Sequence, residues 1–350
     1  MTTRAAAPEV TIPPIWCPIE PRVHPQQSQI ETAVIEWLNN FEFAPEIRRR
    51  GVATRSGSWA SRVAPDGDLG RTVIQACWAC WAFLFDDQYI DDGSIARVPA
   101  ECNPLMCRVL HSAVHPETAD GEPFSTALTD LVTRYRSATT SPTLFQHWLS
   151  CHYVWLLGSA CSVSDRSAGR VRSVDDHMII GPLDRASALT TTMIEISEGT
   201  ELPTAERDLP HVRALTGAAH ILETCYNDIG SYHREVQQDA PESDLVYLLQ
   251  TAHHRTPRDA MADAAAMLDR VMTLFLTLRD QCWPTASQQL RRYLTQLSNK
   301  IRGNLDFQRE TPRYSTGPGP AFDYTDHPTD GRLIPVSPSI AWWWDLVARH

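Results

Sequence analysis

The sequence predicts an all-α fold in a single large domain. Apolar residues recur at helical spacing through most of residues 29–314, and we find no convincing strand pattern and no internal repeat. Prolines stand where several of the predicted helices begin, which suits their fixed backbone angle. With 350 residues, the chain is long enough to bury a sizeable core.

The predicted elements follow one another with little interruption. A Pro-rich segment, residues 1–28, is expected to be an extended arm that lies over the body. Helical periodicity begins at Gln29, and a second helix is predicted at 45–51. A strongly apolar helix then runs from about Gly70 into a cluster of aspartates. A loop at 93–104 precedes helices at 104–115, 123–137 and 142–162.

The second half is also helical. Residues 172–199 are predicted to form a helix that Gly181-Pro182 interrupts, because proline removes a hydrogen-bond donor. Longer helices are predicted at 209–238, 243–251, 257–280 and 284–309. Residues 315–350 are expected to form a Pro/Gly-rich lid or tail that ends in a short amphipathic helix. We expect the tryptophans of that helix, Trp342–Trp344, to dock on the body.

Composition excludes several classes of protein. A net charge of −11 without any Lys/Arg run argues against nucleic acid as a partner. No apolar run is long enough for membrane insertion, and the N-terminus lacks a signal pattern. Nine cysteines without a regular framework indicate a reducing, cytoplasmic location; Cys77 and Cys80 are interpreted as core residues. A homodimer is left open.

Two stretches carry candidate metal ligands. Asn227, Ser231 and Glu235 are spaced four residues apart, so a helix would stack their oxygens along one face. Amide, hydroxyl and carboxylate oxygens suit Mg²⁺ better than zinc or copper. A solvated helix face with accidental spacing is the alternative interpretation.

The second stretch ends the apolar helix with four carboxylates, which belong to Asp86, Asp87, Asp91 and Asp92. Carboxylates on a core helix repel one another and are costly to bury without a cation. A metal cluster is the simplest explanation, and an exposed, frayed helix end is the alternative.

Together, these motifs resemble those of the bacterial-type class I terpene synthases. Asp86-Asp87 with Asp91 resembles the aspartate-rich motif of that family, and Asn227, Ser231 and Glu235 match its second metal motif. A C-terminal Arg-Tyr pair is also present as Arg313-Tyr314, after Asn304 and Phe307. The resemblance covers about residues 30–320. It implies an antiparallel helical barrel around a central cavity.

The resemblance also implies roles for individual residues. Asp86 would ligate two of three expected Mg²⁺ ions, and the Asn-Ser-Glu set would ligate the third; the role of Asp92 stays open. Asp87 would pair with Arg313, while Arg234 and Tyr314 would donate hydrogen bonds to a diphosphate.

One position departs from the family pattern. The family usually has an arginine that senses the diphosphate, followed three residues later by an aspartate. Aligned on Asp184, that position is Gly181 here. Either Arg185 or Arg172 replaces the sensor, or the metals and Arg313 act without one. Arg185 on a surface turn is the alternative interpretation.

The resemblance implies a cyclase that ionises a linear prenyl diphosphate and cyclises the carbocation. We favour the C20 geranylgeranyl chain over the C15 farnesyl chain because small residues, among them Ala79, Ala82 and Gly217, occupy the presumed cavity helices. Aromatic candidates for the cavity wall are Trp78, Trp81, Phe83, Phe85, Trp148, Trp155 and Phe307. The alternatives are a chain-elongating trans-prenyltransferase and a non-catalytic prenyl-lipid binder.

Overall fold

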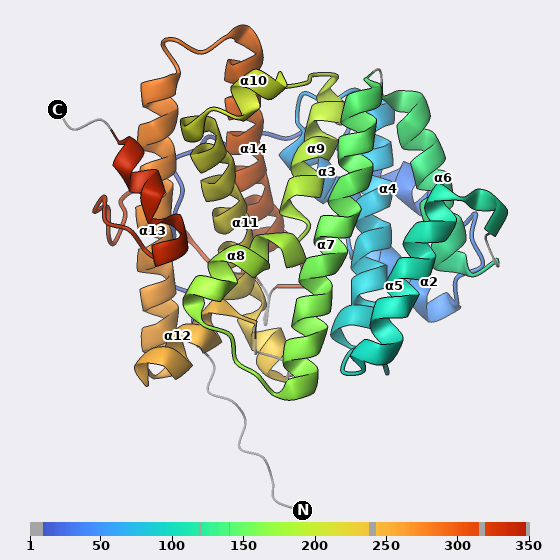
Figure 1. Cartoon of the computed structure of the whole chain (residues 1–350), viewed down its shortest axis with the longest axis horizontal. Coiled ribbons are helices and arrows are strands. Elements are labelled where there is room, and N and C mark those ends of the chain that lie inside the picture. Colours follow the sequence, from blue (N-terminus) through green and yellow to red (C-terminus); the bar gives the residue numbers. More distant parts are fainter. Residues whose placement is uncertain (1–9, 119–120, 140, 238–242, 315–318, 348–350) are drawn as a thin grey trace, which may run out of the picture.

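The computed structural model describes residues 10–118, 121–139, 141–237, 243–314 and 319–347. These residues are overwhelmingly helical, so the all-α prediction is confirmed (Figure 1). The helices are α1 (Gln27–Leu38), α2 (Pro45–Ala53), α3 (Ser56–Val63), α4 (Leu69–Phe85), η1 (Asp86–Asp91), α5 (Pro99–Val114), η2 (Pro116–Thr118), α6 (Pro123–Ala138), α7 (Pro142–Ala168), α8 (Val174–Asp184), α9 (Ser187–Glu198), α10 (Thr204–Arg207), α11 (Pro210–Gln237), α12 (Leu245–His253), α13 (Pro257–Cys282), α14 (Gln288–Glu310) and η3 (Pro338–Leu346).

Two hydrophobic clusters organise the molecule. One joins α11, α12, α13 and most of α14 with the N-terminal arm and η3, and the other joins α1, α3, α4, α5, α6, α7 and α9. In Figure 1 the first group lies on the left and most of the second lies on the right. The long helices α4, α7, α11, α13 and α14 run roughly along a common direction. A pocket lies where the two groups of helices meet. Its apolar residues belong to the second cluster, and α11 and α14 line it mainly with polar residues.

Helix α4 positions the aspartates that follow it beside this pocket. Asp68 caps its first turn by accepting a hydrogen bond from the backbone N–H of Arg71. Nearly every face of the helix is buried in the core, and the buried side chains are mostly small or aromatic. From Asp86 to Asp91 the α-helix gives way to a π-helical turn, η1. Because a π-helix bonds residue i to residue i+5, this turn brings Asp91 close to the face that carries Asp86.

The predicted interruption at Gly181-Pro182 is wrong. Helix α8 continues through both residues, and the break comes at Arg185-Ala186, where Ala186 has a φ of +54°. Close packing holds the end of α8 in place. A Cβ added to Gly181 would lie 2.9 Å from Thr224 Cγ2 of α11, and one added to Gly158 of α7 would lie 2.3 Å from the Asp184 nitrogen. The end of α8 therefore packs closely against α7 and α11.

Other boundaries differ as well. Helix α3 was not predicted, because its Ser- and Gly-rich first turn lacks an apolar pattern. The loop predicted at 93–104 is shorter, since α5 already begins at Pro99. Pro99 occupies the first helical turn, where a missing N–H is tolerated, and Pro104 follows inside the helix. Helix α7 extends to Ala168 and ends at Gly169, whose φ is +60°.

The two terminal segments meet on the body. Strand β1 (Ile15–Trp16) pairs in parallel with β2 (Tyr324–Thr325), a pairing that was not predicted. Residues of the arm from Val10 to Ile19 contribute buried side chains to the first cluster. Residues 1–9 of the arm and 315–318 of the predicted lid lie outside the described residues. Within the part of the chain that the structure describes, no helix has the length and apolar character required to cross a membrane.

The C-terminal tryptophans dock mainly as expected. Trp343 and Trp344 are buried, whereas Trp342 is 38% exposed. Trp343 lies against Gly217 of α11, where an added Cβ would approach its Cζ2 atom to 2.5 Å. The element is a 3-10 helix, η3, and Asp175 accepts hydrogen bonds from Ser337 and from the backbone N–H of Ser339.

Candidate active site

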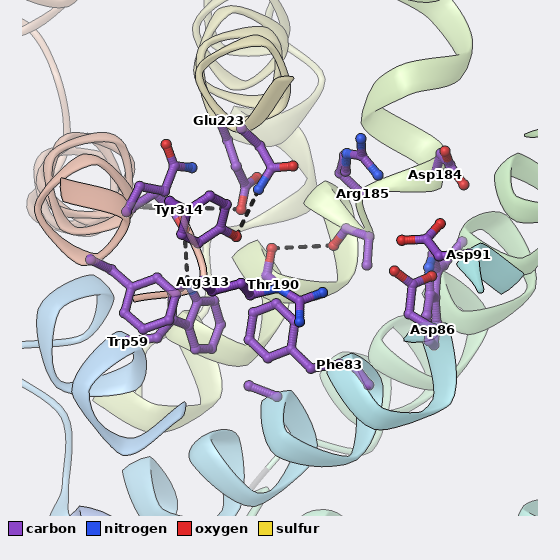
Figure 2. Close-up of a pocket in the computed structure, with 18 of the residues that line it drawn as sticks. Trp59, Phe83, Asp86, Asp91, Asp184, Arg185, Thr190, Glu223, Arg313 and Tyr314 are labelled. Carbon is purple, nitrogen blue, oxygen red and sulfur yellow. Dashed lines mark hydrogen bonds between the residues drawn. The ribbon is translucent and has the colours of Figure 1, made fainter. Parts of the chain in front are cut away.

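The pocket where the two groups of helices meet contains about 870 Å³ of empty space, part of it open to solvent. Its walls come from α3, α4, η1, α7, α9, α11, α14, the α8–α9 break and the Arg313-Tyr314 pair. Figure 2 shows three aspartates and Arg185 gathered on one side, and Trp59, Tyr314 and Glu223 toward the other. The labelled residues of the first side are Asp86, Asp91, Asp184 and Arg185. The pocket therefore combines a charged part with an apolar part.

The aspartates of η1 have different partners. Asp86 and Asp91 line the pocket, whereas Asp87 is buried and turns toward Arg313. The pKa of Asp86 is raised well above its usual value by burial and by the neighbouring carboxylates of Asp91, Asp184 and Asp87. Ionised Asp86 therefore lies in an environment that favours an added cation.

Arg313 and Asp87 form a bidentate ion pair. Arg313 Nη2 lies 2.6 Å from Asp87 Oδ1, and Nη1 lies 3.0 Å from Oδ2. The pairing implied by the resemblance is thus present in the structure. Because both residues are largely buried, the pair ties the end of α14 and its following turn to η1 across the pocket.

Two further arginines approach the aspartates. Arg234 Nη1 lies 3.9 Å from Asp87 Oδ1, and its Nη2 lies 4.0 Å from Asp91 Oδ2. Arg166 Nη2 lies 3.7 Å from Asp91 Oδ1. Burial alone would raise the pKa of Asp91, but the positive charges around it, led by that of Arg234, lower it.

The second motif lies on α11, as predicted. The side-chain nitrogen of Asn227 donates to the Tyr314 hydroxyl at 2.9 Å, so its amide oxygen is not used in that bond. Ser231 donates to Glu235 Oε1 at 2.7 Å. Asn227 lines the pocket, while Ser231 and Glu235 are buried behind it. Glu235 Oε2 is buried and accepts no hydrogen bond among the described residues.

Arg185 stands between these two groups of ligands. It follows the end of α8, lines the pocket and lies with Nη2 3.3 Å from Asp228 Oδ1 and 3.4 Å from Glu235 Oε1. Its side chain is only 20% exposed. The interpretation of Arg185 as a surface residue is therefore wrong. Arg185 reaches the pocket because the helix breaks directly after it. The sequence-based prediction placed this break four residues earlier, at Gly181-Pro182.

Arg172, the other proposed substitute for the sensor, lies elsewhere. Its side chain is fully buried, with Nη2 2.8 Å from Asp165 Oδ2 and 3.0 Å from Ser162 Oγ, both on α7. It does not line the pocket. Arg172 fastens the segment before α8 to α7 and is not brought to the candidate site.

The donor groups fit a hard divalent cation. All of the candidate ligands offer oxygen, which Mg²⁺ prefers, and none of them is a thiol or an imidazole. The raised pKa of Asp86 reports negative charge that lacks compensation, and Glu235 Oε2 is an orphaned buried oxygen. Asp228, by contrast, accepts from His177 Nε2 at 2.7 Å and from Arg185. Asp228 therefore orients Arg185 and is not free to ligate an ion with both oxygens.

The apolar part of the pocket contains some of the predicted aromatic residues. Four of the candidates line it: Trp78, Phe83, Trp155 and Phe307. The other three candidates lie in the surrounding core: Trp81, Phe85 and Trp148. Among the small residues proposed for the cavity, Ala79 and Ala82 line it, but Gly217 instead contacts Trp343. Gly217 therefore does not support the sequence argument for a larger substrate.

Five lining residues were missed by sequence reasoning: Trp59, Ala186, Thr190, Glu223 and Gln308. Trp59 belongs to the unpredicted helix α3, and its indole N–H donates to Asn304 Oδ1 at 2.7 Å. Glu223 precedes Asn227 by four residues on α11 and so shares its face. That spacing was available in the sequence and would have identified Glu223.

The chain matches known proteins along nearly its whole length. Residues 77–273 match the sequence model of terpene synthase family 2, C-terminal metal binding. It is 30% identical to phomopsene synthase from Allokutzneria albata over 98% of this chain and 100% of that protein. It is 29% identical to spiroviolene synthase from Streptomyces violens, over 96% and 97% of the two chains.

Solved structures agree. A mutant of the SVS_A2 protein from ancestral sequence reconstruction superposes with a TM-score of 0.87 at 31% identity, over 96% of this chain and 99% of that chain. The 2-methylisoborneol synthase of Streptomyces coelicolor A3(2) shares the fold with a TM-score of 0.79 at 16% identity, over 89% and 99% of the two chains. Because the family model covers more than half of the chain, and the relatives align end to end, the chain belongs to terpene synthase family 2 and is a class I terpene cyclase, a lyase with the all-α fold of that class.

Proposed function

We propose that this cyclase ionises a linear prenyl diphosphate with the help of three Mg²⁺ ions and releases a cyclic terpene and inorganic diphosphate. One observation carries the proposal: the carboxylates of Asp86 and Asp91 and the amide of Asn227 line one pocket together with Arg185, Arg234 and Arg313. Oxygen ligands and guanidinium groups around a single cavity are suited to a metal–diphosphate complex.

The metal ligands would be divided between two elements. Asp86, supported by Asp91, would hold ions on the η1 side, and Asn227, Ser231 and Glu235 would hold one on the α11 side. Mg²⁺, when bound, neutralises charge on the diphosphate and so makes it a better leaving group. To let Glu235 act as a ligand, Arg185 would exchange its contact with Glu235 for one with the diphosphate.

Side chains of this protein would hold the diphosphate and keep water away. Arg234 and Arg313 would donate to its oxygens, joined by the Tyr314 hydroxyl, and these bonds strengthen as negative charge develops. Asp87 would keep Arg313 aimed into the pocket through the bidentate pair. That pair also connects α14 to η1, which supports closure of the site around the substrate.

The apolar part of the pocket would fold the prenyl chain and stabilise the carbocation formed from it. The aromatic faces of Trp78, Phe83, Trp155 and Phe307 line the pocket and offer no lone pair. Each such face stabilises a nearby positive charge by roughly 0.5–2 kcal/mol. They would hold the folded chain while its carbon–carbon bonds form.

We propose the C20 geranylgeranyl chain as substrate, with the C15 farnesyl chain as the close second. Ala79 and Ala82 are small and leave space beside the aromatic wall. Relatives include a protein named as a diterpene cyclase, from a Streptomyces species, and a (+)-T-muurolol synthase from Streptomyces clavuligerus, named as cyclising farnesyl diphosphate. These names support both chain lengths for the family.

A chain-elongating transferase is the less favoured function. Lys300 is the sole lysine of the sequence, and it is buried in a pair with Glu223 instead of facing the acidic side of the pocket. The candidate ligands for metal ions likewise count against a non-catalytic prenyl-lipid binder, which would need none of them.

The experiment is to incubate the purified protein and Mg²⁺ separately with C10, C15 and C20 prenyl diphosphates and to identify the products by mass spectrometry. We expect a cyclic product from the C20 substrate at the highest kcat/KM. A higher kcat/KM with the C15 substrate would refute the chain-length proposal and leave the cyclase assignment intact. Conversion of none of the three would refute the proposed substrates altogether.

A further inference from the structure

A buried ion pair stands in the wall of the pocket away from the aspartates. Glu223 lines the pocket from α11, one helical turn, about 6 Å, before Asn227. Figure 2 shows it on the opposite side of the pocket from Asp86 and Asp91. Its carboxylate lies 2.7 Å from the Lys300 ammonium of α14. No step proposed above uses either residue.

The ammonium of Lys300 is fully accommodated. Besides Glu223 Oε2, it contacts the backbone oxygen of Ser187 at 2.7 Å and Thr191 Oγ1 at 2.9 Å. An ammonium has three donors, and here three acceptors surround it. Burial lowers the pKa of Lys300, and the negative charge of Glu223 acts in the opposite direction. The three oxygens around the ammonium favour a charged lysine, and Glu223 Oε2 lies in the position of its counter-ion.

The two oxygens of Glu223 are engaged differently: Oε2 forms the ion pair with the ammonium but no hydrogen bond of good geometry among the described residues. Oε1 accepts one long hydrogen bond, 3.3 Å, from the side-chain nitrogen of Asn304. Asn304 is itself held by the Trp59 indole, which donates to Oδ1, and by the Lys300 backbone oxygen, to which it donates. The network therefore fixes the carboxylate while leaving lone-pair capacity on the oxygen that Asn304 contacts.

An ion pair in this place is unfavourable for a purely structural role. Desolvating two charges costs free energy that a hydrophobic pair of similar size would not cost. A carboxylate beside a carbocation cavity also introduces a lone pair that the aromatic walls lack. A fixed base is useful in one step of a cyclisation, the last one, because a carbocation is consumed when a neighbouring C–H bond loses its proton.

We propose that Glu223 is the base that ends the reaction and that Lys300 is the positioning residue that keeps it ionised and in place. The C–H bond next to the cationic carbon breaks, and its electron pair forms the new C=C bond. The proton bonds to Glu223 Oε1, giving a neutral carboxylic acid and a neutral hydrocarbon. When product and diphosphate leave, the acid returns its proton to water. The inference rests on the proposed cyclisation.

The test compares Glu223→Gln with the parent at saturating Mg²⁺, using whichever of farnesyl and geranylgeranyl diphosphate the parent converts. We expect the share of the parental hydrocarbon among all products to fall at least about tenfold, replaced by double-bond isomers or less cyclised hydrocarbons. Diphosphate release should fall much less, by about threefold at most. The parent's diphosphate release reports on the proposed function, and the variant's product composition reports on Glu223, so the two failures are separable.

A second variant removes both charges, Glu223→Gln with Lys300→Met, in case the single change impairs folding. It should show the same change in products. The matched control is Glu195→Gln, since Glu195 is also buried and ion-paired, 2.8 Å from Arg207, but does not line the pocket. Its product composition should equal that of the parent. An unchanged product composition in a folded Glu223 variant would overturn the proposal, as would an alcohol as the main parental product.

Discussion

Replacing Arg185 with alanine tests how the enzyme manages without an arginine at the usual sensor position. In the structure, its guanidinium bridges Asp228 and Glu235 at 3.3 and 3.4 Å. Both contacts are long, so they can be exchanged for contacts to an incoming diphosphate. An arginine could not simply replace Gly181, the aligned sensor position, because its Cβ would lie 2.9 Å from Thr224 Cγ2.

The expected loss follows from the strength of such contacts. A hydrogen bond between charged groups contributes roughly 1.5–3 kcal/mol. Arg185→Ala should therefore lower kcat/KM for the prenyl diphosphate by about ten- to a hundredfold. Arg185→Lys should recover little of this, because a flexible point charge does not reproduce the planar fork.

The assay measures initial rates of diphosphate release over a range of substrate concentrations, with thermal unfolding followed in parallel. The unfolding curve is needed because Arg185→Ala also leaves Glu235 with fewer partners. Kinetics indistinguishable from those of the parent, in a folded variant, would refute the sensor role. Binding of the diphosphate would then depend on the metals, Arg234 and Arg313.

Three further substitutions separate catalysis from stability. Asp86→Asn and Asn227→Ala should each lower turnover by at least about 100-fold, as expected for lost electrostatic stabilisation, and near-parental turnover of either variant would refute its ligand role. The folded protein raises the pKa of Asp86, so the ionised carboxylate destabilises the metal-free fold at neutral pH. Asp86→Asn should therefore raise the Tm measured in EDTA, and a lower Tm would contradict this reasoning. Arg172→Ala should cost about 1–3 kcal/mol of unfolding free energy, because Asp165 Oδ2 loses a charged donor while Arg170 Nε still donates to Asp165 Oδ1 at 2.6 Å. Urea titration measures this loss, and kcat/KM of the folded enzyme should stay within about threefold of the parental value. A large kinetic loss without destabilisation would reverse that assignment.

The candidate ligands were predictable from the sequence because their spacing encodes their geometry. Asn227, Ser231 and Glu235 share a helical face for any α-helix, and α11 is regular through all three. Asp86 and Asp87 were recognisable because they place carboxylates at the end of an apolar helix. The π-helical turn that relates Asp91 to Asp86 was not predictable, since no residue type in that stretch demands it.

The break between α8 and α9 escaped prediction for a different reason. Proline and glycine at 181–182 favour an interruption locally, but both residues are helical, and the end of α8 packs closely against α7 and α11. The chain breaks instead at Ala186, which adopts a positive φ although it carries a Cβ. Tertiary contacts thus decided the position of Arg185, and only the structure brings it to Asp228 and Glu235.

The apolar wall was partly predictable. Trp78 and Trp81 lie three residues apart on α4, and the sequence gives no reason why one lines the pocket and the other packs in the core. Which face of α4 lines the cavity depends on the helices that pack against it, and α3 is one of them. Helix α3 contains Trp59 and was not predicted, because its short sequence is rich in Ser and Gly.

The most direct test of the cyclase assignment is the stoichiometry of the reaction. The purified protein, given Mg²⁺ and a single prenyl diphosphate, should release one inorganic diphosphate for each cyclic terpene formed, and EDTA should abolish both products together. An elongated prenyl diphosphate as product, or equal activity in EDTA, would contradict the account.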